Sequence, residues 1–381
     1  MSASPTAVEA PSVPERATAL ETARIFALHL LCFVLPVTAL AFLLTAPHPW
    51  YLSLPFFGVV IASVELDKRS RAERRQPAER LTAWPFDAVL YVLVAMQLVI
   101  VALALHMVWA HGFWRMDTLV AWLLVGINSG YSGIVVAHEL IHRPSRRMQR
   151  LGRALLVSVL YEHFYTEHVR GHHVRVGTPE DPATARFGET FHQFFRRTVP
   201  AQLRSAWRLE AKRLGDEEMP LTDRRLLRSR VAQGLAIEWG IALAILGLLG
   251  VGPFVLYVGQ ALIAIRLLEA VNYFEHWGLV RSTKRVTPLD SWDTESWFTL
   301  YTLVGLSRHA DHHAFATRPY QQLRHWDPSP KLPYGYFGMV EMVLFANRKF
   351  RETMTEELRR TKLGPFAEEK PAPETAAATA A

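Results

Sequence analysis

Nine of the sixteen histidines in this sequence gather in four short boxes, and their spacing suits the binding of metal ions. Crowded imidazole rings repel one another when they are protonated, and a shared metal ion compensates for placing them together. A spacing of four residues recurs in the pairs His138/His142, His168/His172 and His309/His313, which puts two rings on one face of a helix about one turn apart. The boxes are HELIH with His138 and His142, EHVRGHH with His168, His172 and His173, NYFEHWGL with His276, and RHADHH with His309, His312 and His313.

The number of these histidines bears on the number of metal ions. A zinc site takes three or four protein ligands, so nine histidines exceed two such sites. Two ions with octahedral coordination and open positions for oxygen would use all nine. Neutral nitrogen ligands suit iron, copper, zinc and nickel, so ligand type alone does not choose the metal. HELIH also fits a zinc protease with Glu139 as the base, but that interpretation leaves seven clustered histidines without a role.

Six apolar runs predict helices that span a membrane. Half of the 381 residues are apolar, and several runs reach the ~20 residues that a spanning helix needs. Short uncharged connections join neighbouring runs into hairpins. The sequence therefore predicts an all-α, polytopic membrane protein, and the alternative is a large soluble protein with buried helices. The runs cover residues 24–45, 50–66, 84–108, 117–137, 231–250 and 252–274.

The distribution of charge predicts how the protein lies in the membrane. The loop 67–80 carries six Lys or Arg residues and the segment 143–153 carries five, whereas 45–50 and 249–253 carry none. By the positive-inside rule, both termini and the basic segments are cytoplasmic. The net charge of +7 is then mainly a signal of topology, and no nucleic-acid-binding motif accompanies it. We expect an integral protein of a bacterial-type inner membrane that binds no nucleic acid.

The ends of the chain and its cysteine content set further limits. Residues 1–22 contain prolines and lack the apolar core of a signal peptide, so we expect a disordered cytoplasmic segment there. A disordered tail is also expected at 366–381, and one membrane-embedded domain at 23–365. Cys32 is the only cysteine, which excludes a disulfide, an iron–sulfur cluster and a rubredoxin-like Cys₄ site within this chain. Any electrons must therefore come from another protein.

All four boxes are expected at one depth, just inside the membrane. HELIH follows the fourth apolar run, and NYFEHWGL ends the sixth. EHVRGHH and RHADHH each follow an apolar stretch that is too short to span, so they lie at the cytoplasmic face as well.

Several residues within the apolar runs have two possible roles. Arg266 and Glu269 are three residues apart and could pair with each other, or could support a ligand near His276. Gly126, Gly130 and Gly133 precede HELIH. They favour close helix packing, and the alternative is a narrow apolar channel to the metals.

The boxes resemble those of the integral-membrane alkane 1-monooxygenase family, within the histidine-rich di-iron group that includes membrane desaturases. The resemblance runs from about residue 117 to 345, and TPEDPATARFGE (178–189) and LPYGYFGM (332–339) also match that family. It implies two non-haem iron ions bound by all nine histidines. It further implies that Glu139 and Asp311 orient imidazoles through N–H to carboxylate bonds, and that Glu275 is a carboxylate close to the irons.

The reaction implied by this resemblance is hydroxylation of the terminal methyl of a medium-chain n-alkane. It uses O₂ and takes electrons from a rubredoxin or ferredoxin. The segment 196–230, with ten Lys or Arg against five acids, would contact anionic lipid or steer an acidic electron donor. Arg143, where the family commonly has lysine, is shared with the xylene-monooxygenase branch. An aromatic side-chain hydroxylase and a membrane fatty-acyl desaturase are therefore alternatives, and a metal transporter is a third, which predicts ligands near the bilayer midplane.

Overall fold

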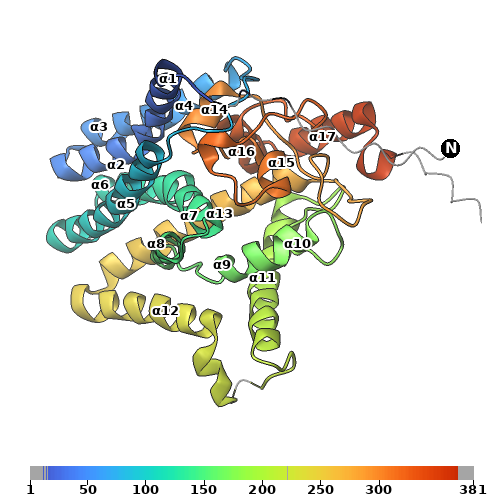
Figure 1. Ribbon diagram of the computed structural model, residues 1–381. Helices are drawn as coiled ribbons and strands as arrows, with labels where there is room; N and C mark the ends of the chain where they lie inside the picture. Colours follow the sequence, from blue (N-terminus) through green and yellow to red (C-terminus); the bar gives the residue numbers. More distant parts are fainter. Residues whose placement is uncertain (1–11, 13, 15, 221, 368–381) are drawn as a thin grey trace, which may run out of the picture.

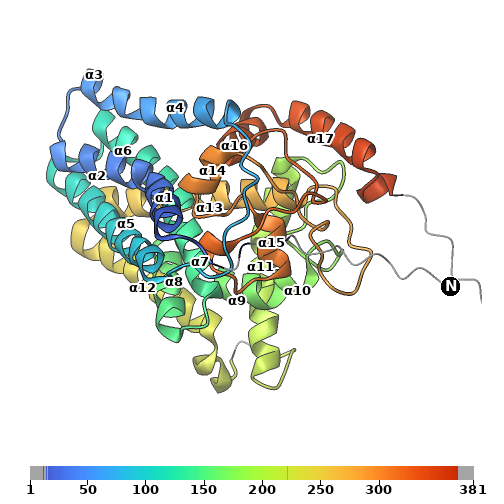
Figure 2. The same cartoon turned by 45° about the horizontal axis from the view of Figure 1, so that its top comes forward.

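The computed structural model describes residues 12, 14, 16–220 and 222–367, and the regular elements in this part of the chain are helical. Six helices are long and apolar enough to cross a membrane, which confirms the predicted all-α membrane fold. These long helices gather on one side of the molecule, and most of the short helices and loops lie on the other (Figures 1 and 2). The spans are Ala19–Thr45, Trp50–Lys68, Trp84–His111, Met116–His142, Arg230–Leu249 and Val251–His276.

The spans coincide closely with the predicted apolar runs. The first consists of α1 and α2 and begins four residues ahead of the expected domain start at residue 23. The others consist of α3 with α4, then α5, then α6 with α7, then α12, and finally α13. Their bounds are α1 (Ala19–His29), α2 (Val34–Thr45), α3 (Trp50–Ser53), α4 (Phe57–Lys68), α5 (Trp84–His111), α6 (Met116–Asn128), α7 (Val135–His142), α12 (Arg230–Leu249) and α13 (Val251–His276).

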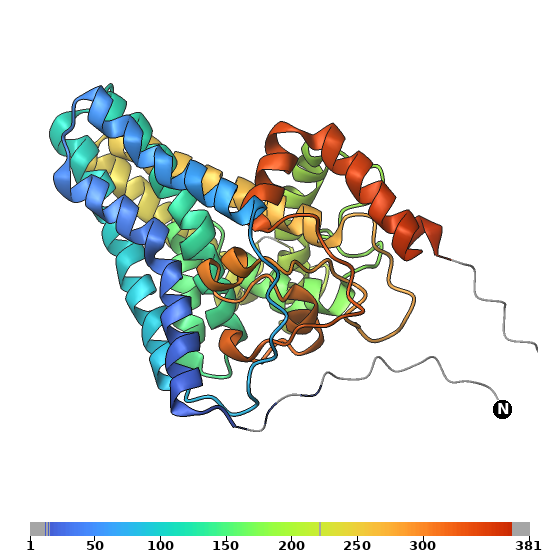
Figure 3. The same ribbon diagram turned by 90° about the horizontal axis from the view of Figure 1, so that it is seen from above.

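The shorter helices pack at one end of this bundle, as the view from above shows (Figure 3). The helices outside the spans are α8 (Arg146–Ser158), α9 (Phe164–Glu167), α10 (His173–Arg175), α11 (Phe191–Arg213), α14 (Trp297–Thr302), α15 (His309–Ala314), α16 (Tyr336–Phe345) and α17 (Asn347–Thr361), and α11 is the one long helix among them. A final 3₁₀ turn, Gly364–Phe366, follows α17, and the Phe366 ring lies 5.6 Å from the ring of Phe187. The predicted disorder at 368–381, and at most of 1–22, lies outside the described residues.

Helix α13 lies at the centre and packs against α5, α6, α12 and α16. Small residues permit its close approach to the fourth span. A Cβ atom at Gly126 would come within 2.7 Å of the Ile263 side chain on α13, and one at Gly259 within 2.1 Å of Trp122 on α6. A Cβ atom at Gly133 would lie 3.1 Å from Gln97 on α5. Close helix packing is therefore the role of Gly126 and Gly133.

The polar side chains of α13 find separate partners. The Glu269 carboxylate accepts hydrogen bonds from Tyr161 at 2.9 Å, Gln202 at 2.9 Å and Asn272 at 3.1 Å. Arg266 instead lies over the rings of Phe191 and Phe195. The pair between Arg266 and Glu269 that the sequence suggested is therefore wrong. Glu269 joins α13 to α11 and to the loop before α9.

Asp67 ties the second span to the elements around the histidine boxes. Its side chain is 2% exposed and accepts hydrogen bonds from Ser296 at 2.6 Å, Thr299 at 2.7 Å and the Gly338 N–H at 3.1 Å. These partners belong to the start of α14 and to α16. One buried carboxylate thus holds three segments that are distant in sequence.

We predict that Asp67→Ala destabilises the fold, because it leaves three buried donors without an acceptor. A loss of about 3 kcal/mol is expected, since hydrogen bonds to charged groups are the stronger kind. The measurement is the thermal unfolding midpoint in detergent. Glu65→Ala is the matched control, because Glu65 lies on the same helix, is 48% exposed and pairs only with Lys68 and Arg69. Equal midpoints for the two variants would contradict this account of Asp67.

Candidate metal centre

The nine histidines of the four boxes come together in two groups. The five-histidine group and the four-histidine group each have all their potential ligand atoms within 4.8 Å of one another. The groups adjoin, since the rings of His173 and His313, one from each, stack with centroids 4.3 Å apart. The five-histidine group is His138, His142, His168, His173 and His312, and the four-histidine group is His172, His276, His309 and His313.

The ring nitrogens face one another in a way that suits bound cations. In the four-histidine group, Nε2 of His309 lies 3.3 Å from Nε2 of His276 and 2.9 Å from Nε2 of His313. In the five-histidine group, Nε2 of His173 lies 3.1 Å from Nε2 of His168 and 3.2 Å from Nε2 of His312. The remaining three Nε2 atoms, those of His138, His142 and His172, are buried without a hydrogen-bond partner. Such convergence of lone pairs fits metal ions, which imidazole nitrogens bind.

The surroundings keep five of these imidazoles neutral. Burial, and next the repulsion from neighbouring imidazoles, lowers the pKa of each of the five well below its ordinary value. A neutral imidazole has a free lone pair for a metal ion at physiological pH. The rings concerned are His168, His173, His309, His312 and His313.

Helix ends position most of the boxes, as the sequence predicted. His138 and His142 lie one turn apart at the end of α7 and belong to the same group. His309 and His313 lie one turn apart on α15 and also share a group. His276 is the last residue of α13.

The box EHVRGHH follows a different rule from the one that its spacing suggested. Residues His168–His172 form a π-helical turn, in which hydrogen bonds join residues five apart instead of four. His168 therefore shares a group with His173, and His172 belongs to the other group. The expectation that His168 and His172 act as an i, i+4 pair is wrong, because the wider turn changes which side chains share a face. A second π-helical segment, Ser129–Ile134, precedes α7.

The structure gives Glu139 and Asp311 partners other than imidazoles. Glu139 Oε1 accepts hydrogen bonds from Arg143 Nε at 2.6 Å and from the Tyr320 N–H at 3.2 Å. The expectation that Glu139 orients an imidazole is therefore wrong. Each acid follows or precedes a ligand directly in its helix, and side chains one residue apart do not face each other.

Asp311 holds the loop after α15 in place. Its carboxylate accepts hydrogen bonds from Arg318 at 2.6 Å, from the Arg324 N–H at 2.9 Å and from Trp326 Nε1 at 2.8 Å. Its expected role of orienting an imidazole is likewise wrong. Asp311 instead fixes the segment that covers the histidine box.

Asp181 is the acid that orients an imidazole, and sequence reasoning did not select it. Its Oδ2 atom lies 2.8 Å from His172 Nδ1 and accepts a hydrogen bond from Thr184 at 2.6 Å. Burial alone would raise the pKa of Asp181, but the attraction of His172 and these hydrogen bonds outweigh it and lower the pKa. An anionic partner on Nδ1 leaves Nε2 as the ligand atom. The only signal in the sequence was the match of TPEDPATARFGE to the family.

Glu275 lies beside the four-histidine group. Its Oε2 atom is 3.2 Å from His309 Nε2, and its Oε1 atom accepts a hydrogen bond of 2.6 Å from the Tyr336 hydroxyl. Tyr336 is fully buried and also donates to the Leu306 carbonyl at 3.2 Å. Tyr336, from the motif LPYGYFGM, thus fixes the orientation of this carboxylate.

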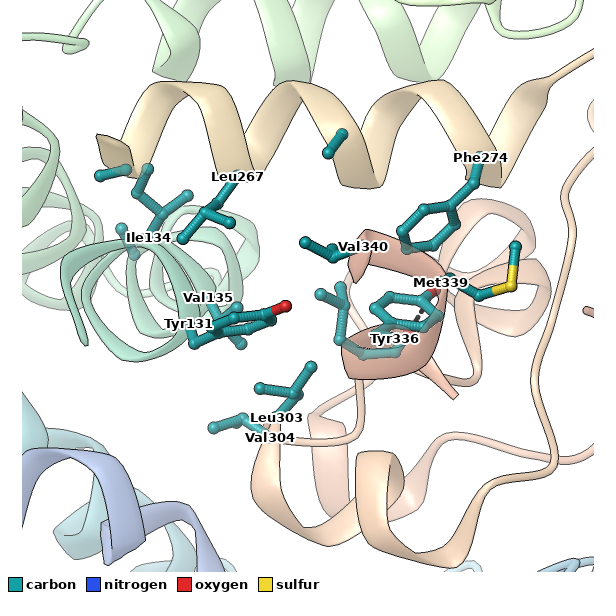
Figure 4. Close-up of a cluster of buried hydrophobic side chains, with 14 of the residues drawn as sticks. Tyr131, Ile134, Val135, Leu267, Phe274, Leu303, Val304, Tyr336, Met339 and Val340 are labelled. Carbon is teal, nitrogen blue, oxygen red and sulfur yellow. Dashed lines mark hydrogen bonds between the residues drawn. The ribbon is translucent and has the colours of Figure 1, made fainter. Parts of the chain in front are cut away.

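An apolar cavity inside the bundle ends at histidines of both groups. His138 and His168 of the five-histidine group and His309 of the four-histidine group line its inner end, with Glu275 beside them. Tyr131, Val135, Leu267 and Leu303 come from three segments and point toward one another around this space (Figure 4). Gly130 also lines the cavity, whereas Gly126 and Gly133 do not. Of the three glycines, only Gly130 therefore fits the predicted channel.

Comparison with known proteins places the chain in a family. Residues 116–341 match the family model described as fatty acid desaturase, and the chain belongs to this family. The chain is 42% identical over 270 residues to alkane 1-monooxygenase 1 of Pseudomonas aeruginosa. This alignment covers 67% of this chain and 69% of that protein.

Two further relatives are less similar to the chain. It is 40% identical over 227 residues to the alkane 1-monooxygenase of Acinetobacter baylyi, covering 57% of this chain and 55% of that protein. It is 25% identical over 235 residues to the hydroxylase component of a xylene/toluene monooxygenase of Pseudomonas putida, covering 59% of this chain and 60% of that protein. The alignment with the Acinetobacter protein thus spans little more than half of its length.

We predict that Asp181→Asn weakens metal binding by about 10- to 100-fold, the usual effect of removing the partner of a metal-bound histidine. The measurement is the rate at which metal leaves the purified protein in the presence of a chelator. The neighbouring Glu180→Gln is the matched control, because Glu180 makes no contact with a histidine of either group. Metal retention equal to that of the unaltered protein would show that Asp181 has no part in ligation.

Proposed function

We propose that this protein is a membrane di-iron monooxygenase that hydroxylates the terminal methyl of a medium-chain n-alkane. The observation that carries the proposal is the apolar cavity that ends at histidines of both groups. A hydrocarbon partitions into the bilayer, and the cavity lies between α13 and the fourth span within the helical bundle. The similarity to alkane 1-monooxygenases supports the same activity.

The reaction consumes the alkane, O₂, two electrons and two protons, and yields the alcohol and one water. Two iron ions, when bound, supply the activation of O₂ and the transfer of one oxygen atom into the C–H bond. The histidine groups hold the ions, and the apolar walls exclude water and direct one end of the chain toward His138 and His309. Glu275 offers a carboxylate oxygen next to His309, where a proton can be held, and Tyr336 keeps it in place.

We predict about two iron ions per chain in protein purified without oxygen, because two groups of histidines cannot share one ion. His172→Ala and His312→Ala each remove a ligand from a different group and should abolish turnover while the membrane fold persists. Metal analysis and single-turnover product formation measure both effects. His192→Ala is the control, since His192 is exposed on α11 and belongs to neither group. A content of one zinc ion per chain, with turnover that does not depend on iron, would contradict the proposal.

The alternative substrate, a methyl-substituted aromatic, rests on Arg143. In the structure this residue lies away from the cavity: its guanidinium bonds to Glu139 and lies 3.2 Å from Asp87 on α5. Arg143 is not among the residues that line the cavity. The one residue shared with the xylene branch therefore does not touch the substrate space, which favours a linear alkane.

We predict that octane is converted to 1-octanol much faster than xylene is converted to methylbenzyl alcohol. Leu267→Phe should shorten the accepted alkane before it lowers the maximal rate, because Leu267 lines the cavity two helical turns before Glu275. Leu262→Phe is the matched control on the same helix, since Leu262 is 59% exposed on the outside of the bundle. Product analysis over a series of alkanes measures the effect. Faster turnover of xylene would contradict the proposed alkane substrate but not the proposed di-iron site. An alkene product would indicate a desaturase.

The electron donor is proposed to be an acidic protein such as a rubredoxin or ferredoxin that docks on α11. The exposed side chains of Arg204 and Arg208 line a basic surface groove together with Lys212 and Arg175. Helix α11 also contacts the π-helical turn that carries His168 and His172. A donor at this surface would thus lie over one of the boxes, and attraction between opposite charges would raise its rate of association.

We predict that donor-dependent turnover falls as salt rises, because the screening length shrinks to about 3 Å at 1 M salt. The double variant Arg204→Glu/Arg208→Glu should reproduce the effect of high salt, while turnover with a small chemical reductant stays unchanged. Arg348→Glu reverses an 88% exposed charge on α17 and serves as the control. If donor-dependent rates change neither with salt nor with charge reversal, the donor does not dock on α11. The basic surface of α11 would then contact anionic lipid instead.

The proposed location is a bacterial inner membrane, with both termini in the cytoplasm. The excess of Lys and Arg in the loops 67–80 and 143–153 supports this orientation. His142 and His276 are the last residues of their spans. Ligands at helix ends argue against a metal transporter, whose binding site would lie near the midplane of the bilayer.

A further inference from the structure

A second cavity lies beside the first span and shares no lining residue with the apolar cavity. It is bounded by the start of α1, the loop around residues 75–77, α14 and the segment 320–323. Helix α1 lies next to α14 in Figure 1, at the upper edge of the molecule. We call this space the N-terminal pocket. Neither the histidine groups nor the proposed reaction uses it.

The N-terminal pocket has an excess of positive charge. Arg24, Arg75 and Arg308 line it, against the single lining acid Glu21. Arg75 is already paired with Glu73, which leaves Arg24 and Arg308 as the cations available to a ligand. Arg308 is 6% exposed, and its guanidinium donates to the carbonyls of Leu323 and Arg75 at 2.5 and 2.6 Å. Those partners are neutral, so the buried charge of Arg308 has no carboxylate within ion-pair distance among the described residues. A buried cation that no carboxylate touches is costly, and a bound anion would offset that cost.

Two buried polar side chains of the pocket have atoms without a hydrogen-bond partner in the described structure. Both the nitrogen and the oxygen of the Gln321 amide are unpaired within the described structure, and Gln321 is 3% exposed. Nδ1 of His29, also 3% exposed, is unpaired as well. Leaving buried donors and acceptors unsatisfied is costly, and a polar ligand would satisfy them. These side chains are independent of the arginines and point to a polar ligand in the same space.

The remaining wall is apolar and lies at the edge of the membrane. Leu20, Ile25 and Leu300 contribute to it, and Leu20 is 81% exposed. The pocket lies at the beginning of the first span, Ala19–Thr45, where hydrocarbon gives way to the headgroup region. A ligand that satisfies both sides has an anionic head and an apolar tail.

We propose that the N-terminal pocket binds the anionic headgroup of one membrane amphiphile, either the phosphate of a phospholipid or the carboxylate of a fatty acid. The head lies against Arg308, Arg24 and the Gln321 amide, and the tail runs along α1 in the bilayer. A ligand at this site would also contact residues that neighbour the metal centre. Arg308 directly precedes His309, and the N–H of Tyr320, another residue of the pocket wall, bonds to Glu139.

The test is native mass spectrometry of the full-length protein, stripped of lipid in detergent and then titrated with dioleoylphosphatidylglycerol, dioleoylphosphatidylcholine or oleate. We expect one phosphatidylglycerol per chain, bound about tenfold more tightly than phosphatidylcholine, as charge-assisted hydrogen bonds would give. The double variant Arg24→Gln/Gln321→Leu should lose this preference. Arg69→Gln is the matched control, because Arg69 is an exposed arginine at the end of α4 that does not line the pocket.

The outcomes separate the two sources of the anion and leave the proposal open to refutation. One tightly bound oleate, with weak binding of both phospholipids, would assign the head to a fatty acid carboxylate. Equal binding of the two phospholipids without tight oleate binding, or a preference that survives in the double variant, would overturn the proposal. Arg24→Gln alone changes an exposed side chain and provides the same comparison if the double variant is unstable.

Discussion

Nine imidazole rings in a buried space are the constraint on which the rest of this structure depends. Their Nε2 atoms point at one another or at no partner, so the arrangement suits cations between them. Burial lowers the pKa of His168, His173, His309, His312 and His313, so these rings are neutral and able to bind metal. The ends of two spanning helices carry three of the nine rings, those of His138, His142 and His276.

The acids around the centre hold the imidazole rings in place in two different ways. Asp181 acts directly on an imidazole, and Glu275 faces the four-histidine group under the control of Tyr336. Glu139 and Asp311 act on the rings indirectly. Each accepts a hydrogen bond from the backbone of the loop after α15, and each lies on a helix, α7 or α15, that carries two or three of the rings. Arginine partners suit this second role, since a planar guanidinium can hold a carboxylate and a backbone carbonyl in a defined geometry.

The membrane fold and the proposed chemistry depend on the same packing. Glycines at Gly126 and Gly259 let α13 approach α6 closely. Further along the fourth span, the π-helical segment Ser129–Ile134 and α7 leave an apolar space beside α13 that ends at the histidines. A hydrocarbon has no polar group by which it could be recognised. The shape of the cavity and the exclusion of water from it therefore select the substrate. The basic surface of α11 and the N-terminal pocket lie outside this path, and their charges suit ligands of a different kind.

The sequence by itself determined the six spans, the convergence of the boxes and the paired ligands on α7 and α15. These features follow from local rules, namely the length of apolar runs and the period of an α-helix. Tertiary structure decided how the nine histidines divide into two groups, because the π-helical turn His168–His172 departs from that period. It also decided that Asp181 orients His172, that Glu139 and Asp311 hold loops, and that Arg143 lies away from the cavity. Glu139 contacts Tyr320, which is 181 positions away in the chain, so no local pattern encodes that contact. The contacts of Asp181 with His172 and of Asp311 with Arg324 and Trp326 span 9 to 15 positions and depend on how loops fold, which the period of a helix does not predict.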